Sequence, residues 1–569
     1  MQARVIPIVA GGEVQRERKR GGPKGRRAGA TSVAEVRETL GDAPRRRDLL
    51  IEHLHKLQDR FGHLSAGHLT ALAEEMRMAQ SEVFEVASFY HHFDIVKEGM
   101  DAPAALTVRV CDGLSCELAG AQKLLDKLPA LLGASVRVIP APCIGRCEQA
   151  PAAVVGQNPV PCATTEKVVA SVRLGATKHE PEGYIGLSQY RASGGYRVLE
   201  ECLSGKRKVD DVIATLESSG LRGLGGAGFP AGRKWKIVRA EPAPRLMAVN
   251  IDEGEPGTFK DRVYLERDPH RFLEGMLVAA WAVGIDAIYI YLRDEYHGCR
   301  ALLQQELDRL QADPPSAGLP RIELRRGAGA YICGEESAMI ESIEGKRGMP
   351  RLRPPYVAQV GLFGRPTLEH NFETLYWVRE LLERGAEWFA SKGANGRKGL
   401  RSFSVSGRVK DPGVKLAPAG ITIQELIDEY CGGMLDGHRF YGYLPGGASG
   451  GILPATMNDI PLDFDTLQPY GCFIGSAAVV VLSHQDRATD AARNLMRFFR
   501  EESCGQCTPC RAGTAKALAI IEQPNWDLPL LDELSRVMRD ASICGLGQAA
   551  PNPVDCVVKY FPQELGDPK

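Results

Sequence analysis

The chain has 569 residues, enough for about three or four domains of ordinary size. Its 44% hydrophobic and 25% charged residues are typical of a globular protein in water, and its formal net charge of −1 gives no argument for nucleic acid or membrane partners. The longest apolar stretches, such as GMLVAAWAVGI from Gly275, are shorter than the ~20 residues of a membrane-spanning helix. The first residues lack the apolar segment of an export signal, so we expect a cytoplasmic protein whose 15 cysteines are not disulfides.

The N-terminal third shows four successive patterns. Residues 1–45 are basic and glycine-rich without an apolar stripe, which predicts a disordered tail, or alternatively a segment that contacts an acidic partner subunit. Apolar residues at helical spacing predict a small helical bundle over 46–100. Alternating segments, LTVRVCDGLSC and ASVRVIPAPCIGRC, predict strands joined by a helix over 105–175, each delivering cysteines just past its end. Residues 176–189 have the composition of a linker.

The remainder of the chain predicts three further domains. Residues 190–395 alternate helical patterns with β-rich runs, and each run is followed by a polar loop, as expected of an α/β domain that binds a ligand beyond its strand ends. Residues 400–483 are β-rich with one clear helix, which predicts a small α+β module. Residues 486–562 are helical in pattern.

A glycine-rich stretch, GLRGLGGAGFP from Gly220 to Pro230, contains the GxGxxG letters of dinucleotide sites. A helical pattern precedes it instead of a strand, and Pro230 is expected to delay any following helix, so the context does not favour a Rossmann site. The loop leads to Lys234 and Trp235, with Phe229 on its rim. It is either a structural turn or a loop whose backbone N–H groups approach a phosphate.

The tightest cysteine pattern is ESCGQCTPCRAG, which is followed after a helical interval by ASICGLG. Thiolates at CxxCxxC spacing can bind one face of a 4Fe-4S cluster, and a fourth cysteine from a distant loop completes the set; zinc and unrelated core cysteines are the alternatives. Thr508 is expected to cap the next helix with Pro509 at its first position, which puts Cys510 in the first turn. The predicted 4Fe-4S ligands are Cys504, Cys507, Cys510 and Cys544.

A second set of cysteines follows the two predicted strands of the 105–175 domain. Two loops that offer two thiolates each can divide them between the irons of a 2Fe-2S cluster, with zinc or plain thiols as alternatives. The predicted ligands are Cys111, Cys116, Cys143 and Cys147. Two clusters in one chain imply one-electron transfer, and flavin is the usual converter between single electrons and a two-electron substrate.

Six blocks of sequence carry a family resemblance. They are GLRGLGGAGFPAGRKW, NIDEGEPGTFKDR, GAGAYICGEESAMIESIEGKRGMPRLRPP, HNFETL, ESCGQCTPCR and ICGLGQAA. Together they resemble the flavin-bearing, NADH-oxidising subunit of respiratory NADH dehydrogenase and of NAD-linked formate dehydrogenases and hydrogenases. FGHLS, EVASFYHHF and CIGRCEQAP resemble the thioredoxin-like 2Fe-2S subunit, and the fused arrangement looks most like the beta subunit of a molybdenum or tungsten NAD-dependent formate dehydrogenase.

The resemblance implies a fold, cofactors and partners. The fold is an α/β multidomain one: a helical bundle with a thioredoxin-like 2Fe-2S domain, an FMN-binding α/β domain, a β-grasp (ubiquitin-like) insert and a C-terminal helical 4Fe-4S domain. The cofactors are FMN, NAD, one 4Fe-4S cluster and one 2Fe-2S cluster. The partner in the resulting hetero-oligomer is a larger catalytic subunit with iron–sulfur clusters and a molybdenum or tungsten pterin. The insert is expected to pack between the flavin and cluster domains, or alternatively to hold a small ligand.

The resemblance also implies site residues. The FMN contacts are Gly223, Gly225, Lys234, Asn250, Asp252, Glu253, Tyr331, Gly334, Glu335, Asn371 and Thr374. The contacts to the nicotinamide nucleotide are Gly226, Phe229, Glu255, Glu336 and Tyr356. His370 stands where the family has asparagine beside the flavin, and Arg353 and Tyr356 replace lysine and phenylalanine.

The carboxylate-rich loops DEGEPGTFKD and GEES could, without the other blocks, be ordinary solvated loops. Because hydride transfer between nicotinamide and flavin needs aligned rings and no strong acid or base, Glu255 and Glu336 are expected to position the nucleotide.

The sequence leaves three functions to compare. The first is a diaphorase subunit that couples formate oxidation to NAD⁺ reduction. The second is the diaphorase subunit of an NAD-reducing hydrogenase or of NADH:quinone oxidoreductase, with the same local chemistry. The third is a zinc-stabilised interaction scaffold without catalysis.

Overall fold

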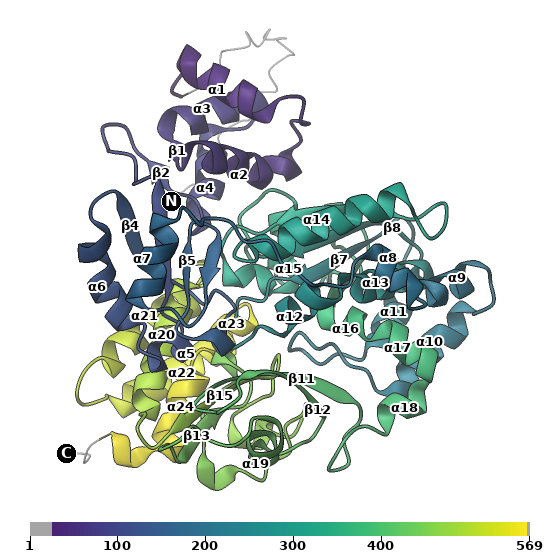
Figure 1. Ribbon diagram of the computed structural model, residues 1–569, viewed down its shortest axis with the longest axis vertical. Coiled ribbons are helices and arrows are strands. Elements are labelled where there is room, and N and C mark those ends of the chain that lie inside the picture. The colour runs from purple at the N-terminus through teal and green to yellow at the C-terminus, as the bar shows by residue number, and fades with distance from the viewer. Residues whose placement is uncertain (1–24, 566–569) are drawn as a thin grey trace, which may run out of the picture.

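The computed structural model describes residues 25–565 (Figure 1). The N-terminal bundle contains α1 (Ala30–Leu40), α2 (Leu50–Phe61), α3 (Ala66–Met76) and α4 (Gln80–Phe89). The helix α1 lies within the segment expected to be a disordered tail, and it buries Val36 and Leu40 in the core of the bundle. The basic residues before 25 lie outside the described part of the chain.

A four-stranded sheet with the order β4-β3-β5-β6 follows the bundle. The parallel strands β3 (Leu106–Cys111) and β4 (Val136–Ala141) are joined through α5 (Leu114–Leu118) and α6 (Gln122–Leu132), which matches the predicted strand, helix and strand. The strands β5 (Ala153–Val155) and β6 (Asn158–Val160) add an antiparallel hairpin, and α7 (Thr165–Arg173) follows it. The arrangement is the predicted thioredoxin-like one.

The central α/β domain has a parallel sheet with the order β10-β7-β8-β9. Its strands are β7 (Arg245–Ile251), β8 (Ile285–Leu292), β9 (Arg321–Arg326) and β10 (Thr367–Asn371). The chain runs from β7 to β8 to β9 in one direction and then returns to place β10 on the other side of β7. A change of direction of this kind opens a crevice at the carboxyl ends of the two strands, the usual ligand position in open α/β sheets.

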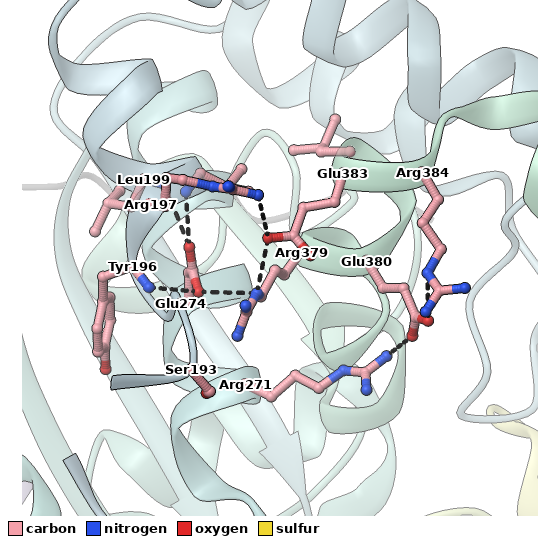
Figure 2. Close-up of polar contacts among 12 residues, drawn as sticks. Ser193, Tyr196, Arg197, Leu199, Arg271, Glu274, Arg379, Glu380, Glu383 and Arg384 are labelled. Carbon is pink, nitrogen blue, oxygen red and sulfur yellow. Dashed lines mark hydrogen bonds and ion pairs between the residues drawn. The ribbon is translucent and has the colours of Figure 1, made fainter. Parts of the chain in front are cut away.

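A buried carboxylate, Glu274 on α13 (Pro269–Val283), fixes the helices at the start of this domain (Figure 2). It accepts hydrogen bonds from the Tyr190 hydroxyl at 2.6 Å and from the backbone N–H of Tyr196 at 2.9 Å and Val198 at 3.1 Å. Arg379 Nε lies 3.5 Å from the same carboxylate. Glu274 therefore satisfies the free N–H groups at the start of α9 (Arg197–Leu203).

The glycine-rich loop follows α10 (Val209–Ser219), as the helical pattern predicts. The helix α11 (Ala231–Ala240), however, begins directly after Pro230, so the expectation that Pro230 would delay a helix is wrong. Pro230 occupies the position before the first helical residue, where a missing N–H removes no bond within the helix.

The module after the central domain is a five-stranded sheet with the order β12-β11-β15-β13-β14. Its strands are β11 (Leu400–Gly407), β12 (Gly413–Pro418), β13 (Phe440–Leu444), β14 (Leu453–Pro454) and β15 (Ala478–Ser483), and α19 (Ile423–Glu425) provides its short helix. The first and last long strands, β11 and β15, are parallel neighbours, as in a β-grasp fold.

The C-terminal helices are α20 (Ala488–Glu501), α21 (Thr508–Ile521), α22 (Leu528–Ala541), α23 (Gly545–Ala549) and α24 (Asn552–Tyr560). In Figure 1 they lie beside both the thioredoxin-like domain and the β-grasp sheet. Among residues 25–565, no helix combines the length and the apolar character needed to cross a bilayer.

The bundle is joined to the central domain by a buried polar network. Three side chains, His55 on α2, His92 after α4 and Asp294 after β8, each have one possible metal-ligand atom, and these atoms lie within 4.8 Å of one another. The Asp294 carboxylate accepts from Arg326 Nε at 2.6 Å and lies 2.7 Å from His92 Nδ1. Because a guanidinium already neutralises this carboxylate, the cluster is an ion-pair network that fixes two domains together.

Candidate functional site

The carboxyl edge of the sheet where β7 and β10 end, called the crevice below, brings together residues from these two strand ends and from the loop after β9. Asn250, at the end of β7, donates from Nδ2 to the Gly334 carbonyl at 2.9 Å, so the loop after β9 is fixed beside it. Asn371, at the end of β10, donates to the Asp261 carboxylate at 2.8 Å. The family resemblance predicts that these residues surround a flavin although they lie more than 100 positions apart, and the parallel sheet brings them to one edge.

The glycine-rich loop closes over the same edge of the sheet. Gly223 N donates to the Phe229 carbonyl at 2.8 Å, and Leu224 N donates to Thr374 Oγ1 at 2.9 Å. A Cβ atom added at Gly225 would lie 2.9 Å from the Asn371 Cβ, and Gly226 has a φ of +123°. Glycine is needed here because the loop backbone packs directly on β10.

Two acidic residues after β7 have different surroundings. Asp252 Oδ2 is buried and has no hydrogen-bond partner within residues 25–565, and burial raises the pKa of Asp252 well above its usual value. An unpaired buried polar atom of this kind fits a bound group that forms hydrogen bonds, such as a flavin ring or its ribityl chain. The Glu253 carboxylate instead accepts from Asp261 N at 2.9 Å and Arg262 N at 3.1 Å, at the start of α12 (Lys260–Arg267).

The side chain of Glu253 therefore faces the protein and not the crevice. Burial, together with the charge of Asp261, raises the pKa of Glu253 to about 7. A contact from Glu253 to a flavin is then available only through its backbone.

Charged and aromatic side chains form the rim of the crevice. Lys234 Nζ donates to the Glu369 carbonyl at 3.0 Å, and Glu336 is paired with Arg353 at 3.0 Å. Burial raises the pKa of Glu336, and the nearby Glu369 raises it further. The Phe229 residue is 38% exposed, with the Arg233 guanidinium 5.8 Å from its ring centroid, and Tyr356 is 55% exposed, so both rings offer aromatic surface to a planar ligand.

Glu335 has a structural role at the same rim. Its carboxylate accepts from Ser337 N at 3.0 Å and Ala338 N at 2.9 Å and so caps α15 (Glu336–Ile343). It is also paired with Arg353.

Two contacts connect the crevice to the other modules. Glu255 Oε1 accepts from Ser449 N at 2.9 Å, in the PGGASGG loop of the β-grasp sheet, and burial raises the pKa of Glu255. Tyr331 N donates at 2.9 Å to the buried Glu502 carboxylate, which lies just before the CxxCxxC segment. The Tyr331 ring packs on Phe498 of α20 at 4.9 Å between centroids. The sequence does not single out Ser449 or Glu502, because nothing local to either residue indicates its partner.

His370 is hydrogen-bonded within the protein. Its Nε2 accepts a hydrogen bond from Trp235 Nε1 at 2.7 Å, and burial lowers the pKa of His370 well below its usual value. The ring is therefore a neutral part of the packing between α11 and β10.

The four cysteines of the thioredoxin-like domain are all buried. Cys111 ends β3 and Cys116 lies on α5, while Cys143 lies in the loop after β4 and Cys147 begins the 3-10 turn Cys147–Gln149 that follows this loop. The Sγ atoms of Cys143 and Cys147 are 3.4 Å apart. Two thiolates on one tetrahedral metal are about 3.8 Å apart, so this pair fits one metal ion of a cluster. A Cβ atom at Gly113 would touch Cys143 and the Cys111 sulfur, which brings the two pairs together.

The C-terminal cysteines meet at two helix starts. Cys507 and Cys544 are the residues before the first turns of α21 and α23, and Cys510 lies in the first turn of α21, as predicted. Thr508 is the first residue of α21 and not its cap, so that expectation is wrong. A Cβ atom at Gly547 would lie 2.8 Å from the Cys510 Cβ, which shows how closely the Cys544 segment packs on α21. A negatively charged cluster is favoured at these helix N-termini.

Comparison with protein families assigns a class to these modules. The matching descriptions are the thioredoxin-like [2Fe-2S] ferredoxin over residues 36–174, the Nuo51 FMN-binding domain over 216–380, the SLBB domain over 402–453 and the NADH-ubiquinone oxidoreductase-F iron-sulfur binding region over 490–567. The protein is a flavin and iron–sulfur oxidoreductase subunit, and the predicted FMN, 2Fe-2S and 4Fe-4S cofactors and fold class are confirmed.

Individual relatives define the family. The chain is 40% identical over 399 residues to an NADH-quinone oxidoreductase subunit of Rhizobium meliloti, covering 68% of this chain and 94% of the relative. It is 40% identical over 379 residues to the mitochondrial 51 kDa subunit of NADH-ubiquinone oxidoreductase of Neurospora crassa, covering 63% of this chain and 76% of that relative. The chain belongs to this family of NADH-quinone oxidoreductase subunits.

A solved structure extends the likeness to the fused N-terminal part. A chain of an NAD⁺-reducing [NiFe]-hydrogenase in the H₂-reduced state superposes with a TM-score of 0.80 and 32% sequence identity, covering 92% of each chain. Such relatives are subunits of larger assemblies.

Proposed function

We propose that the chain is a diaphorase subunit that exchanges a hydride between NAD and FMN and relays single electrons to or from a partner subunit. The observation that supports this most strongly is the connection between the modules. The loops of the crevice contact the 4Fe-4S segment through Tyr331 and Glu502, and the 2Fe-2S loop through Arg293 and Cys143. When bound, FMN supplies the conversion between a hydride and single electrons.

The residues proposed for FMN provide a cradle of backbone groups and polar side chains. The glycine loop, Asn250, Asn371 and Thr374 fix its walls, and the buried Asp252 carboxyl group offers an unpaired oxygen for a hydrogen bond. The remaining proposed contacts are Lys234, Glu253 through its backbone, Tyr331, Gly334 and Glu335.

The nicotinamide nucleotide is proposed to enter over the rim. Phe229 and Tyr356 offer ring faces for the adenine, and Glu255 and Glu336 position the nucleotide by accepting hydrogen bonds from ribose or carboxamide groups. Gly226 leaves room for its close approach. Neither carboxylate needs to remove a proton, because alignment of the two rings is the requirement for hydride transfer.

The proposed metal ligands are the two sets of four cysteines, with Cys111, Cys116, Cys143 and Cys147 for 2Fe-2S and Cys504, Cys507, Cys510 and Cys544 for 4Fe-4S. The zinc scaffold has no support from the family matches, which describe flavin and iron–sulfur domains.

The proposed partner is the catalytic subunit of a cytoplasmic molybdenum or tungsten formate dehydrogenase, with electrons running from formate to NAD⁺. Its basis is the resemblance of the fused arrangement and of the closing segment GLGQAAPNPVDCVVKYFP to that enzyme's beta subunit. A hydrogenase partner is the second candidate, favoured by the match over 92% of the chain to an NAD⁺-reducing [NiFe]-hydrogenase.

Purification of the native complex under anaerobic conditions separates these candidates. Reduction of NAD⁺ by formate, with molybdenum or tungsten in the preparation, supports the first, whereas reduction by hydrogen alone supports the second. A chain that binds FMN but does not oxidise NADH with an artificial electron acceptor contradicts the diaphorase function itself.

A further inference from the structure

Two buried arginines hold the loop that carries Cys143 and Cys147 against the central domain. Arg293 Nη2 donates to the Cys143 carbonyl at 2.6 Å, and Arg262 Nε donates to the Gly145 carbonyl at 2.9 Å. Gly145 has a φ of +70°, and a Cβ atom there would lie 2.3 Å from the Tyr296 hydroxyl oxygen. The backbone of this loop is therefore closely fitted to the central domain.

Arg293 also contacts the loop proposed to bind the flavin. Its Nη1 donates to the Glu253 carbonyl, and its Nε donates to Glu295 at 3.0 Å. The guanidinium lies over the Tyr296 ring, whose hydroxyl donates to the Glu253 carboxylate at 2.8 Å. The Arg293 guanidinium thus donates hydrogen bonds both to the carbonyl of Cys143, a proposed cluster ligand, and to the carbonyl of Glu253, on the loop proposed to bind the flavin.

The position of this charge has an electrostatic consequence. The Arg293 side chain is only 4% exposed, and a guanidinium stays protonated even when buried. Reduction adds one negative charge to a thiolate-ligated cluster. A buried cation that is hydrogen-bonded to the backbone of a ligand residue favours the reduced cluster, because charges interact strongly away from water. Its partner Glu295 is 22% exposed, so water screens the opposing carboxylate more than the guanidinium.

We propose that Arg293 is a positioning residue that holds the 2Fe-2S loop against the flavin-side loop and raises the reduction potential of the 2Fe-2S cluster. This inference rests on the proposed ligand set of Cys111, Cys116, Cys143 and Cys147. It assigns a task to a side chain that neither belongs to a cysteine motif nor lines the crevice.

The test is an EPR-monitored redox titration of the full chain with its clusters and FMN. Arg293→Gln is expected to lower the equilibrium constant for reduction of the 2Fe-2S cluster tenfold or more, which for one electron is about 59 mV per tenfold. Arg293→Lys keeps the charge but cannot make both carbonyl bonds, so a smaller shift is expected. Arg326→Gln, which removes another buried arginine whose partners are Asp294 and Asp59, is expected to leave the potential unchanged.

An unshifted 2Fe-2S potential in Arg293→Gln, with iron and FMN retained, overturns the proposal, as does an equal shift in Arg326→Gln. If Arg293→Gln does not assemble, Glu295→Gln tests the same effect. Removing the opposing carboxylate should raise the equilibrium constant for reduction of the 2Fe-2S cluster threefold or more, and an unchanged constant refutes the electrostatic effect. Lower thermal stability with an unshifted potential indicates a merely structural arginine. A wild-type chain without any 2Fe-2S signal instead contradicts the cluster assignment, which separates the two failures.

Discussion

Replacement of Glu336 by glutamine tests how the rim of the crevice positions the nicotinamide nucleotide. The Glu336 carboxylate is 3.0 Å from Arg353, and its side chain is 24% exposed. A hydrogen bond to a charged group contributes about 1.5–3 kcal/mol, or about 10- to 150-fold in rate if it is lost from the transition state. Because glutamine keeps one acceptor oxygen and Arg353 already screens the charge, we expect the lower part of this range, about 10- to 30-fold.

The assay is stopped-flow loss of flavin absorbance after mixing with excess NADH, combined with measurement of bound FMN. FMN content should equal that of the wild type. Since burial raises the pKa of Glu336, the carboxylate contribution is present above that raised pKa and is lost as the pH falls through it. The wild-type rate should therefore fall on acidification, and the Glu336→Gln rate should lack this dependence.

Glu341→Gln provides the matched control. Glu341 lies on the same helix and pairs with Arg351 at 2.5 Å, but it is not among the rim residues, so its variant should stay within about twofold of the wild type. Loss of flavin from Glu336→Gln, an unchanged rate, or an equal effect in Glu341→Gln would refute the positioning role.

Three further variants test separate parts of the molecule. Cys504→Ser should lose the 4Fe-4S EPR signal and keep the 2Fe-2S signal. The control Cys472→Ser should keep both signals, because the Cys472 sulfur lies 3.5 Å from the sulfur of another core cysteine. Loss of both signals in both variants would contradict the ligand set. Glu274→Ala should destabilise the start of α9 by about 3–5 kcal/mol, measured as faster amide hydrogen exchange at residues 196–199. The control Glu383→Ala should cost less than about 1 kcal/mol, and equal effects of the two variants would contradict the role of the buried network. Gly225→Ala should weaken FMN binding about tenfold or more, because the added Cβ would lie 2.9 Å from the Asn371 Cβ. Flavin fluorescence measures the affinity. An unchanged affinity would contradict the assignment of this loop to the flavin site.

Local sequence patterns predict much of the architecture. The apolar runs that form β7 and β8, and the alternating run RIELRR that forms β9, are each followed by polar loops, and parallel strands place such loops at one edge. The cysteine spacings likewise indicate clusters, because thiolate ligands must reach one small centre. The family resemblance adds the crevice residues, which no single stretch of sequence would bring together.

The mistaken or missing details involve choices between competing partners. Pro230 is expected from its chemistry to delay a helix, yet it stands where its missing N–H is harmless. His370 departs from the family's asparagine, and its partner, Trp235, lies on another element of the fold. Glu502 contacts Tyr331 across 171 positions and Arg293 contacts Cys143 across 150, and no local periodicity records such pairings.

The central claim is that NADH reduces iron–sulfur clusters on this chain through bound FMN, and EPR of the anaerobically purified protein tests it directly. Addition of NADH should bleach the flavin absorbance and produce signals from a reduced iron–sulfur cluster, with iron and FMN in stoichiometric amounts. A colourless protein that contains zinc, or one whose clusters are reduced by dithionite but not by NADH while FMN is bound, would contradict the account.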